Sequence, residues 1–596
     1  MNTLIKWKNS FFSQFLNNKN KEERLYLYLT LIIGVFTGLV AVALNKSTHY
    51  LTHYLQTDQP FTLKSVLLGG TFIFISGFLT TRFFKSTSGS GIPDVRVSLA
   101  VHHGRLKLKD TIAKFFTTIL SLSSGFSLGL EGPTVRVSSG IGSFIGEKLN
   151  LSKKKLKSLV AVAAAGGIAA AFNTPIAAVI FTLEEVVGDL NAKALGPIIL
   201  SAVVASVTAS YFLGDQATFA KLSYTLNDHR EFILYLTVGL IASVLGPLWM
   251  NSVLWMRKCN HKLFKGHRLT IIMFTFLLMA ALSHLNTTVL GSGHDKIVEV
   301  LLSMVTDWKI LLILFILKFF ATAICYSSGA SGGLFMPTLF MGATLGGLIG
   351  AIAKILFPEF AINIGAYALV GMGAFFVSVI RAPFTSIIIV FEMTRNYNIM
   401  LPLMIANITS YFFSSKFTQG SIYEKMSEED GVHLPSRDDD DLLENLSVEE
   451  AMIKDVKILS SSMHVGAAMK QIKNSEITGY PVLKQGKLLG MISTRDIGMA
   501  YTKELGDVPL EKLCTKDIIT VHPDQSLLVA FHLLNKFQIS RLPVISRLDD
   551  HHMVGLITAE NIVSLFGFHI QEDSKKHLID EYEMEYKKNH PETTTI

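Results

Sequence analysis

A twenty-residue apolar segment occurs twice in this chain, 204 positions apart. The first copy spans residues 114–133, KFFTTILSLSSGFSLGLEGP, and the second spans 318–337, KFFATAICYSSGASGGLFMP; eleven of the twenty positions are identical. Two further segments, 175–184 and 383–392, each begin with proline and end with glutamate. Gly/Pro-interrupted apolar segments in corresponding positions of two halves are typical of membrane transporters built from internal repeats. The repeat therefore favours a membrane protein of two homologous halves.

The composition agrees with this interpretation. Hydrophobic residues make up 49% of the chain and the mean hydropathy is +0.40, which is far too apolar for a soluble protein of this length. Long apolar runs extend from about Tyr26 to Phe417, whereas other stretches are so short or Gly-rich that we expect half-helices inside a bundle. We predict an all-α polytopic membrane domain of two homologous, inverted repeats with broken helices, followed by a cytoplasmic α/β pair.

The chain divides by composition into six parts. Five lysines and arginines precede the first apolar run, and no signal-peptide pattern with a cleavage site is present, so we expect the N-terminus to stay in the cytoplasm of a plasma (inner) membrane protein. The predicted parts are a basic segment at 1–24, a membrane domain at 25–425 with repeats at 25–215 and 230–425, an acidic linker at 426–446, two soluble repeats at 447–505 and 506–568, and a charged tail at 569–596.

Three segments share glycines that precede a proline and an apolar stretch: GSGIP at 89–93, GLEGP at 129–133 and GGLFMP at 332–337. Proline suits the first turn of a helix because its missing N–H would have no partner there. Glycines allow a sharp turn and a close approach of the backbone to an ion. We therefore expect three helix N-termini whose free N–H groups form an anion site inside the membrane.

These three motifs, in this order, resemble the signature segments of the CLC family of chloride channels and transporters. Residues 163–185, 381–394 and 421–426 resemble further stretches of that family. The likeness covers nearly all of residues 30–426, and the two C-terminal repeats resemble a CBS-domain pair. The resemblance implies chloride transport, most simply as a Cl⁻/H⁺ antiporter, by a homodimer with one anion pathway per subunit.

The resemblance also implies roles for single residues. Ser90 matches the serine and Tyr423 the tyrosine that coordinate the central anion with their hydroxyls, while Leu334 and Phe335 match positions that offer backbone N–H groups. Glu131 matches the gating glutamate, whose carboxylate competes with the anion and swings away when protonated. The physics supports this, because an intramembrane carboxylate among N–H dipoles acts as an internal anion that chloride replaces upon protonation.

Glu185 matches the inner proton-handling glutamate of the exchangers, and it favours antiport over the alternative, a passive chloride channel on the same fold. We interpret Glu184 and Glu392 as structural. Leu130 stands where the family has a basic residue, which should weaken anion attraction at the outer mouth. Ser90 favours chloride over nitrate by analogy.

In the CBS-like pair, four residues lie where nucleotide-binding relatives contact the ribose: Ser493, Asp496, Thr558 and Asn561. They are equally ordinary helix N-caps. The sequence therefore leaves open whether the pair binds an adenine nucleotide or only supports structure and dimerisation. No other cofactor is expected.

Other classes of function fit less well. A cation transporter would require clustered carboxylates facing the ion. An intramembrane serine protease built on Ser331 would require a membrane-embedded histidine, yet the next histidine along the chain is His433. The net charge of +7 has no aromatic-interleaved basic face, so we expect no nucleic-acid partner. The scattered cysteines, Cys259, Cys325 and Cys514, form neither a metal pattern nor a disulfide framework. We expect a transporter of chloride and protons in the lipid bilayer, with no metal and no enzymatic activity.

Overall fold

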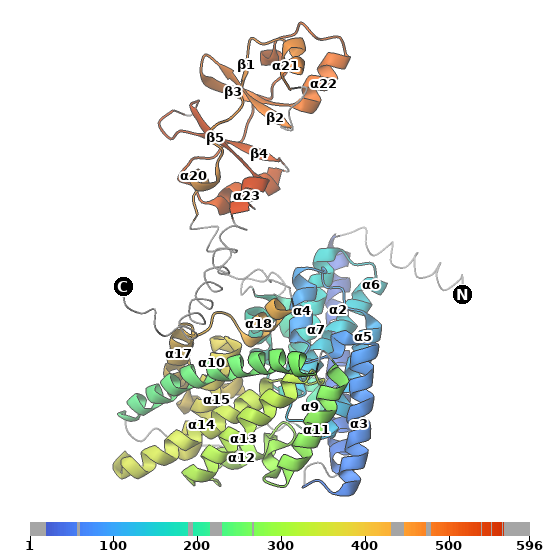
Figure 1. Ribbon diagram of the computed structural model, residues 1–596, viewed down its shortest axis with the longest axis vertical. Coiled ribbons are helices and arrows are strands. Elements are labelled where there is room, and N and C mark those ends of the chain that lie inside the picture. Colours follow the sequence, from blue (N-terminus) through green and yellow to red (C-terminus); the bar gives the residue numbers. More distant parts are fainter. Residues whose placement is uncertain are drawn as a thin grey trace, which may run out of the picture. The chain divides into compact units, whose positions relative to one another are not determined.

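The computed structural model divides into two compact units, residues 1–434 and 435–596, which are described separately (Figure 1). The predicted tail, most of the acidic linker and most of the basic N-terminal segment lie outside the described residues. The structure describes residues 19–55, 60–188, 195–214, 229–264, 267–360, 362–430, 446–472, 478–537, 539–549, 551–562 and 564–565.

Apart from the short 3₁₀ turns η4 (Pro358–Phe360) and η5 (Tyr397–Ile399), the described part of the first unit contains two series of helices that correspond one to one. The first series is α2 (Lys19–Leu55), α3 (Leu63–Arg82), η1 (Lys85–Thr87), α4 (Ile92–Ala100), α5 (Leu108–Ser123), α6 (Glu131–Lys148), α7 (Lys153–Phe172), α8 (Pro175–Phe181) and α9 (Leu195–Leu213). The second series is α10 (Glu231–Leu263), α11 (Arg268–Ser283), η3 (Thr287–Val289), α12 (His294–Leu301), α13 (Trp308–Ser327), α14 (Phe335–Leu356), α15 (Ile364–Ile380), α16 (Pro383–Thr394) and α17 (Met400–Ser414). A π-helical turn, η2 (Thr182–Val187), extends α8, and α18 (Ile422–Glu429) follows the second series. The internal repeat of the sequence is thus a repeat of structure.

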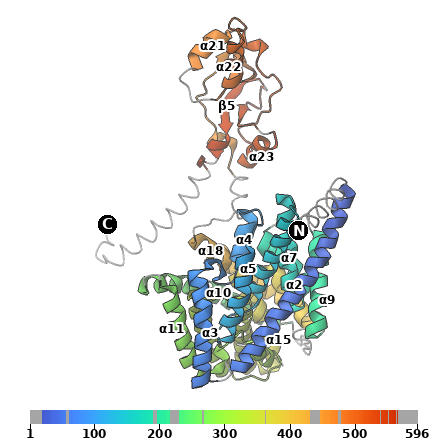
Figure 2. The same ribbon diagram turned by 90° about the vertical axis from the view of Figure 1, so that its right-hand side faces the viewer.

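Seven helices among the described residues are long and apolar enough to cross a membrane: α2, α3, α7, α9, α10, α13 and α14. Others, such as α4 and α8, are only nine and seven residues long, as expected of broken helices that end inside a bundle. Figure 2 shows α2 beside α7 and α9, with which it packs. The predicted all-α membrane domain is confirmed.

Equivalent residues of the two halves contact each other reciprocally. Gly129 and Gly333, which are 204 positions apart, exchange two backbone hydrogen bonds of 2.8 and 2.7 Å in an antiparallel bridge. Antiparallel pairing of equivalent positions is the contact that a two-fold relation between the halves produces. A Cβ on Gly333 would lie 3.1–3.3 Å from atoms of Gly129, Gly132 and Pro133, so the close approach favours glycine.

Carboxylates from each half also cap a helix of the other. Glu392 accepts hydrogen bonds from the backbone N–H groups of Ile176 (3.0 Å) and Ala177 (2.7 Å) in the first turn of α8. Glu184 accepts from the N–H groups of Phe384 (3.3 Å) and Thr385 (2.9 Å) in the first turn of α16. These contacts satisfy free N–H groups in the first turns of α8 and α16 and complement the helix dipoles. Both glutamates therefore have the structural function that the sequence indicated.

The second unit contains two small α/β repeats with separate hydrophobic cores. In the first, β1 pairs parallel with β2, and β2 pairs antiparallel with β3; in the second, β4 and β5 form an antiparallel pair. The repeats contact each other, since the Arg541 guanidinium donates to the Gly479 carbonyl at 2.8 Å. The elements are α20 (Val448–Ala451), β1 (Leu459–Ser460), α21 (Val465–Ile472), β2 (Gly479–Lys484), β3 (Lys487–Ser493), α22 (Thr494–Thr502), η6 (Leu510–Lys512), α23 (Leu527–Phe537), β4 (Arg541–Ile545) and β5 (Met553–Thr558).

Candidate anion site

Three helices begin at the three glycine-proline motifs, as the sequence predicted. Helix α4 begins one residue before Pro93, while α6 and α14 each begin two residues before their prolines. Backbone bridges hold the loops before these helices together, Gly89 with Ser331 and Gly129 with Gly333. Gly89 and Gly91 have φ of +65° and +89°, a conformation that favours glycine. The halves of the chain thus bring three helix N-termini to one place.

Two buried hydroxyl groups face this place. Ser90, directly before α4, and Tyr423, in the first turn of α18, are 1% and 0% exposed. The Tyr423 side chain interacts with the Ser90 side chain, yet neither hydroxyl oxygen has a hydrogen-bond partner in good geometry among the described residues. Buried polar atoms are nearly always paired with protein, water or an ion. Two such hydroxyls therefore form a neutral site suited to a partly dehydrated anion.

Glu131 lies at the start of α6 and is 7% exposed. Its carboxylate folds back over Gly129, where a Cβ would overlap it, and lies against the backbone N–H groups of Glu131 itself and of Met336 in α14. Its Oε2 atom has no partner among the described residues. The carboxylate thus occupies a position between two helix N-termini, where their dipoles favour negative charge.

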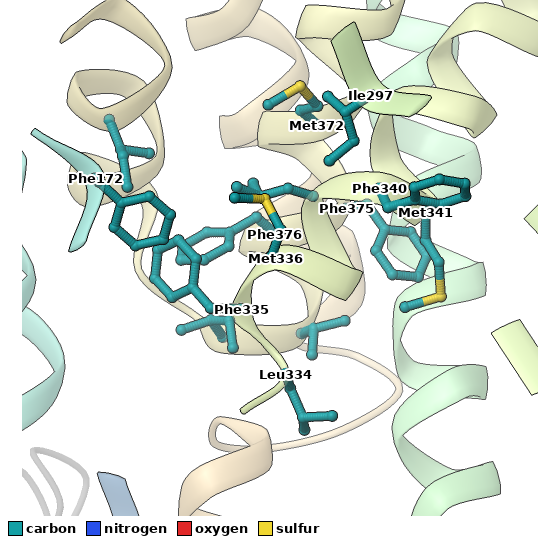
Figure 3. Close-up of a cluster of buried hydrophobic side chains, with 14 of the residues drawn as sticks. Phe172, Ile297, Leu334, Phe335, Met336, Phe340, Met341, Met372, Phe375 and Phe376 are labelled. Carbon is teal, nitrogen blue, oxygen red and sulfur yellow. The ribbon is translucent and has the colours of Figure 1, made fainter. Parts of the chain in front are cut away.

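Leu334 and Phe335 form the N-terminal end of α14 and are fully buried. The Phe335 ring lies 4.7 Å from the ring of Phe172 and 4.7 Å from that of Phe376, measured between centroids (Figure 3). A third ring, Phe181, lies 5.7 Å away. These contacts fix the start of α14, and with it the direction of its free N–H groups, in a site that excludes bulk water.

Glu185 has different hydrogen-bond partners from the residues of the anion site, namely Arg96 and Ser421. It is 4% exposed, lies in the π-helical turn η2, and forms an ion pair with Arg96 of α4. The Ser421 hydroxyl donates to the same carboxylate at 2.8 Å. Arg96 also pairs with Glu424 of α18 at 2.6 Å. No motif of the sequence indicates that Arg96, Ser421 and Glu424 lie around Glu185.

Two buried lysines were also missed. Lys114 of α5 donates to the carbonyl oxygens of Thr87 (2.9 Å) and Gly89 (2.6 Å). These two hydrogen bonds hold the loop before Ser90. The counterpart of Lys114 in the repeat, Lys318, donates to the Gly291 carbonyl at 2.7 Å. That contact reveals a fourth glycine motif, GSGH at 291–294, which corresponds to GSGI at 89–92. The rule that intramembrane charges are functional or paired could have found both lysines.

The position before Glu131 lacks a charge, since Leu130 is the N-cap residue of α6 and packs against the core. The buried cations nearest the Ser90 loop come from other elements. A Cβ on Gly91 would overlap the Arg136 side chain and approach Lys114 Cε at 3.4 Å, so both side chains adjoin this loop. Arg136 in turn lies 3.7 Å from Asp94. The positive charges near the site therefore adjoin the loop that carries Ser90, and none stands directly before Glu131 in the sequence.

The four residues of the predicted nucleotide site form two local caps. Ser493 and Asp496 hydrogen-bond each other at the start of α22, and Thr558 and Asn561 do the same after β5. Both are ordinary N-cap contacts. Nucleotide binding by these residues stays a prediction.

The second unit also has a surface ion pair, between Arg547 and Asp524. The Arg547 guanidinium donates to both oxygens of Asp524 at 2.8 and 2.9 Å, and this hydrogen bonding lowers the pKa of the Asp524 carboxyl. A carboxyl whose pKa is lowered by folding adds stability above its ordinary pKa. That contribution is lost as the pH falls through the lowered value.

A fold of paired broken helices around a dry, mostly neutral site defines a membrane transport protein. The family model described as voltage gated chloride channel matches residues 72–415, and the CBS domain model matches residues 448–501 and 506–567. The chain belongs to the voltage-gated chloride channel (CLC) family and carries a CBS-domain pair. The resemblance drawn from the sequence is confirmed, and the protein is an integral membrane protein.

Curated relatives and solved structures agree with this assignment. An H⁺/Cl⁻ exchange transporter, ClcA of Vibrio cholerae, is 31% identical over 436 residues, which cover 71% of this chain and 93% of that protein. A second relative, from Ralstonia nicotianae, is described as a putative chloride channel protein, ClcB-like. It is 34% identical over 370 residues, which cover 61% of this chain and 85% of that protein. The crystal structure of a eukaryotic CLC transporter has the same fold, with a TM-score of 0.60 and 21% identity over 90% of this chain and 97% of its own.

Proposed function

We propose that the protein exchanges chloride for protons across the membrane. The observation that carries the proposal is the position of the Glu131 carboxylate, buried between the N-termini of α6 and α14 and close to the two unpartnered hydroxyls of Ser90 and Tyr423. Several relatives are named H⁺/Cl⁻ exchange transporters, and this naming supports antiport.

Competition between a carboxylate and an anion for the same N–H groups links chloride to protons. While Glu131 is charged, it occupies the helix N-termini itself. A proton neutralises it and removes its attraction to the dipoles, so chloride takes its place and the side chain swings away. Chloride held only by hydroxyl and N–H donors binds without a full positive charge and is therefore able to leave.

The inner proton-handling residue in this proposal is Glu185. It supplies a second titratable carboxylate, apart from the anion site, so that protons and chloride enter by different routes. We further propose a homodimer with one pathway per subunit. A cytoplasmic N-terminus and CBS pair are also proposed, because five basic residues precede the first apolar run. Adenine nucleotide at the CBS pair is proposed as a regulator.

Flux measurements on two variants test these roles. Glu131→Gln mimics the protonated gate, so chloride flux in reconstituted vesicles should persist while coupled proton flux disappears. Glu185→Gln should lower proton flux and spare chloride flux. Intact proton coupling in Glu131→Gln refutes the gate. Unchanged proton flux in Glu185→Gln refutes the proton-handling role of Glu185. A wild type that passes chloride but moves no protons favours the alternative of a passive channel.

A further inference from the structure

The two hydroxyls of the anion site belong to different helices, which one arginine joins. Ser90 precedes α4 and Tyr423 lies in α18. Arg96 of α4 directs Nη1 to Glu185 and Nη2 to Glu424 of α18, the latter at 2.6 Å. The Arg96 side chain is only 10% exposed and the Glu185 side chain only 5%. Water therefore screens the ion pair between them weakly, and a hydrogen bond between two charged groups is stronger than one between neutral groups.

The N-terminal turn of α18 is built onto this same charge cluster. The N-cap residue Ser421 donates to Glu185 at 2.8 Å, and Arg96 Nη1 lies 3.3 Å from its hydroxyl oxygen. Ser421 and Glu424 form a capping box that ties the turn together. Tyr423 lies between these two residues in the chain. Any shift of the turn therefore moves the Tyr423 hydroxyl relative to Ser90.

We propose that Arg96 is a positioning residue that latches α18 to α4, and that a proton reaching Glu185 loosens this latch and widens the passage between Tyr423 and Ser90. The proposal rests on the exchange function proposed above and adds the link from proton to chloride on the inner side. The charged groups that act on Glu185 are Arg96, Glu424 and the neighbouring Glu184.

The step needs only one proton from the solution. When that proton binds a Glu185 oxygen, the carboxylate becomes a neutral carboxylic acid, and Arg96 loses one of its two anionic partners. The direct ion pair between Arg96 and Glu424 of α18 remains. The second connection, which runs from Arg96 through Glu185 to the N-cap residue Ser421 of α18, is weakened. Arg96 cannot lose its own charge in this range of pH, and the latch therefore responds to Glu185 and not to the guanidinium.

A second arginine provides a matched control. Arg257 of α10 forms ion pairs of 3.2 Å with Glu429, the last residue of α18, and with Asp430, the residue that follows it. Neither contact includes Glu185. Replacing Arg257 removes an anchor of the same helix without touching the carboxylate that takes the proton.

The experiment measures the distance between α4 and α18 in the full-length reconstituted protein. Spin labels are placed at Ala100→Cys and Glu428→Cys, both exposed positions outside the cluster, in a Cys259→Ser background, and pulsed EPR is recorded at pH 7.5 and pH 5. We expect the wild-type distribution to broaden or lengthen at pH 5. Arg96→Gln and Glu185→Gln should give the broad distribution at both pH values, whereas Arg257→Gln should keep the pH response.

Transport gives an independent readout. Arg96→Gln should raise the chloride-to-proton ratio at least twofold, and Arg257→Gln should leave it unchanged. If Arg96→Gln fails to fold, Glu424→Gln removes the direct ion pair and should enlarge the response to acid. The latch is overturned if the wild-type distance distribution is the same at pH 7.5 and pH 5. It is also overturned if Arg96→Gln has the wild-type distances and the wild-type chloride-to-proton ratio. Chloride flux without proton flux in the wild type contradicts the exchange function instead, because the distances are measured without transport.

Discussion

The unpartnered hydroxyl of Ser90 leads to a prediction that separates binding from folding. The Ser90 hydroxyl oxygen has no hydrogen-bond partner in good geometry among the described residues, so Ser90→Ala removes at most its weak interaction with Tyr423. We expect the free energy of unfolding without chloride to change by less than about 0.5 kcal/mol. The stabilisation that chloride adds should fall sharply, since the hydroxyl is proposed to donate to the anion.

The size of the effect follows from linkage. Chloride at 100 times its Kd stabilises the folded state by about 2.7 kcal/mol. A hydrogen bond to a charged group contributes roughly 1.5–3 kcal/mol, so its loss weakens binding about 10-fold to 150-fold. The chloride-dependent stabilisation should then decrease to between about 0.3 and 1.4 kcal/mol. Tyr423→Phe should behave in the same way.

The assay is unfolding of the purified protein in detergent, followed by tryptophan fluorescence, in chloride and in a large impermeant anion. Ser410→Ala is the control, because the Ser410 hydroxyl donates to the Ala374 carbonyl at 2.7 Å inside the core. That variant should lose about 0.5–1.5 kcal/mol in both salts and keep the full chloride increment. A Ser90→Ala protein with an undiminished chloride increment would refute the assignment of this site.

Two further predictions concern stability. Glu392→Gln should lower the free energy of unfolding by about 1–2 kcal/mol, because Ile176 and Ala177 donate to different oxygens of the carboxylate and Gln keeps only one of these oxygens and no charge; unfolding in detergent measures this, and a loss below about 0.5 kcal/mol would contradict the inter-repeat cap. Asp524→Asn should remove part of the acid sensitivity of the CBS unit, because the carboxyl whose pKa Arg547 lowers no longer takes up a proton as the pH falls. Thermal unfolding between pH 3 and pH 7 measures this, and an unchanged pH profile would exclude the pair as a contributor.

Local chemistry explains what the sequence predicted well. Glycines followed by a proline in the first helical turn leave a clear pattern, so the sequence predicted that helices begin at the three motifs, where α4, α6 and α14 begin one or two residues before the proline. The fourth motif, at 291–294, was missed because it is followed by Asp295, whereas the first motif is followed by Pro93. Leu334 and Phe335 were predicted as N–H donors only through the family resemblance.

Long-range contacts explain what the sequence could not predict. Arg96 and Glu185 are 89 positions apart, and Glu392 and Ile176 are 216 apart. No periodicity along the chain indicates which of several carboxylates meets which cation or helix end. Tertiary packing alone decides these pairs. The pairs show that Glu184 and Glu392 cap helices, whereas Glu185 forms an ion pair with Arg96.

The most direct test of the account is proton movement into vesicles that contain the pure protein and carry a chloride gradient. The account predicts that chloride moving down its gradient drives protons uphill, and that Glu131→Gln abolishes the proton movement while chloride still passes. Chloride flux in the wild type with no accompanying proton movement would contradict exchange and leave Glu185 a structural residue.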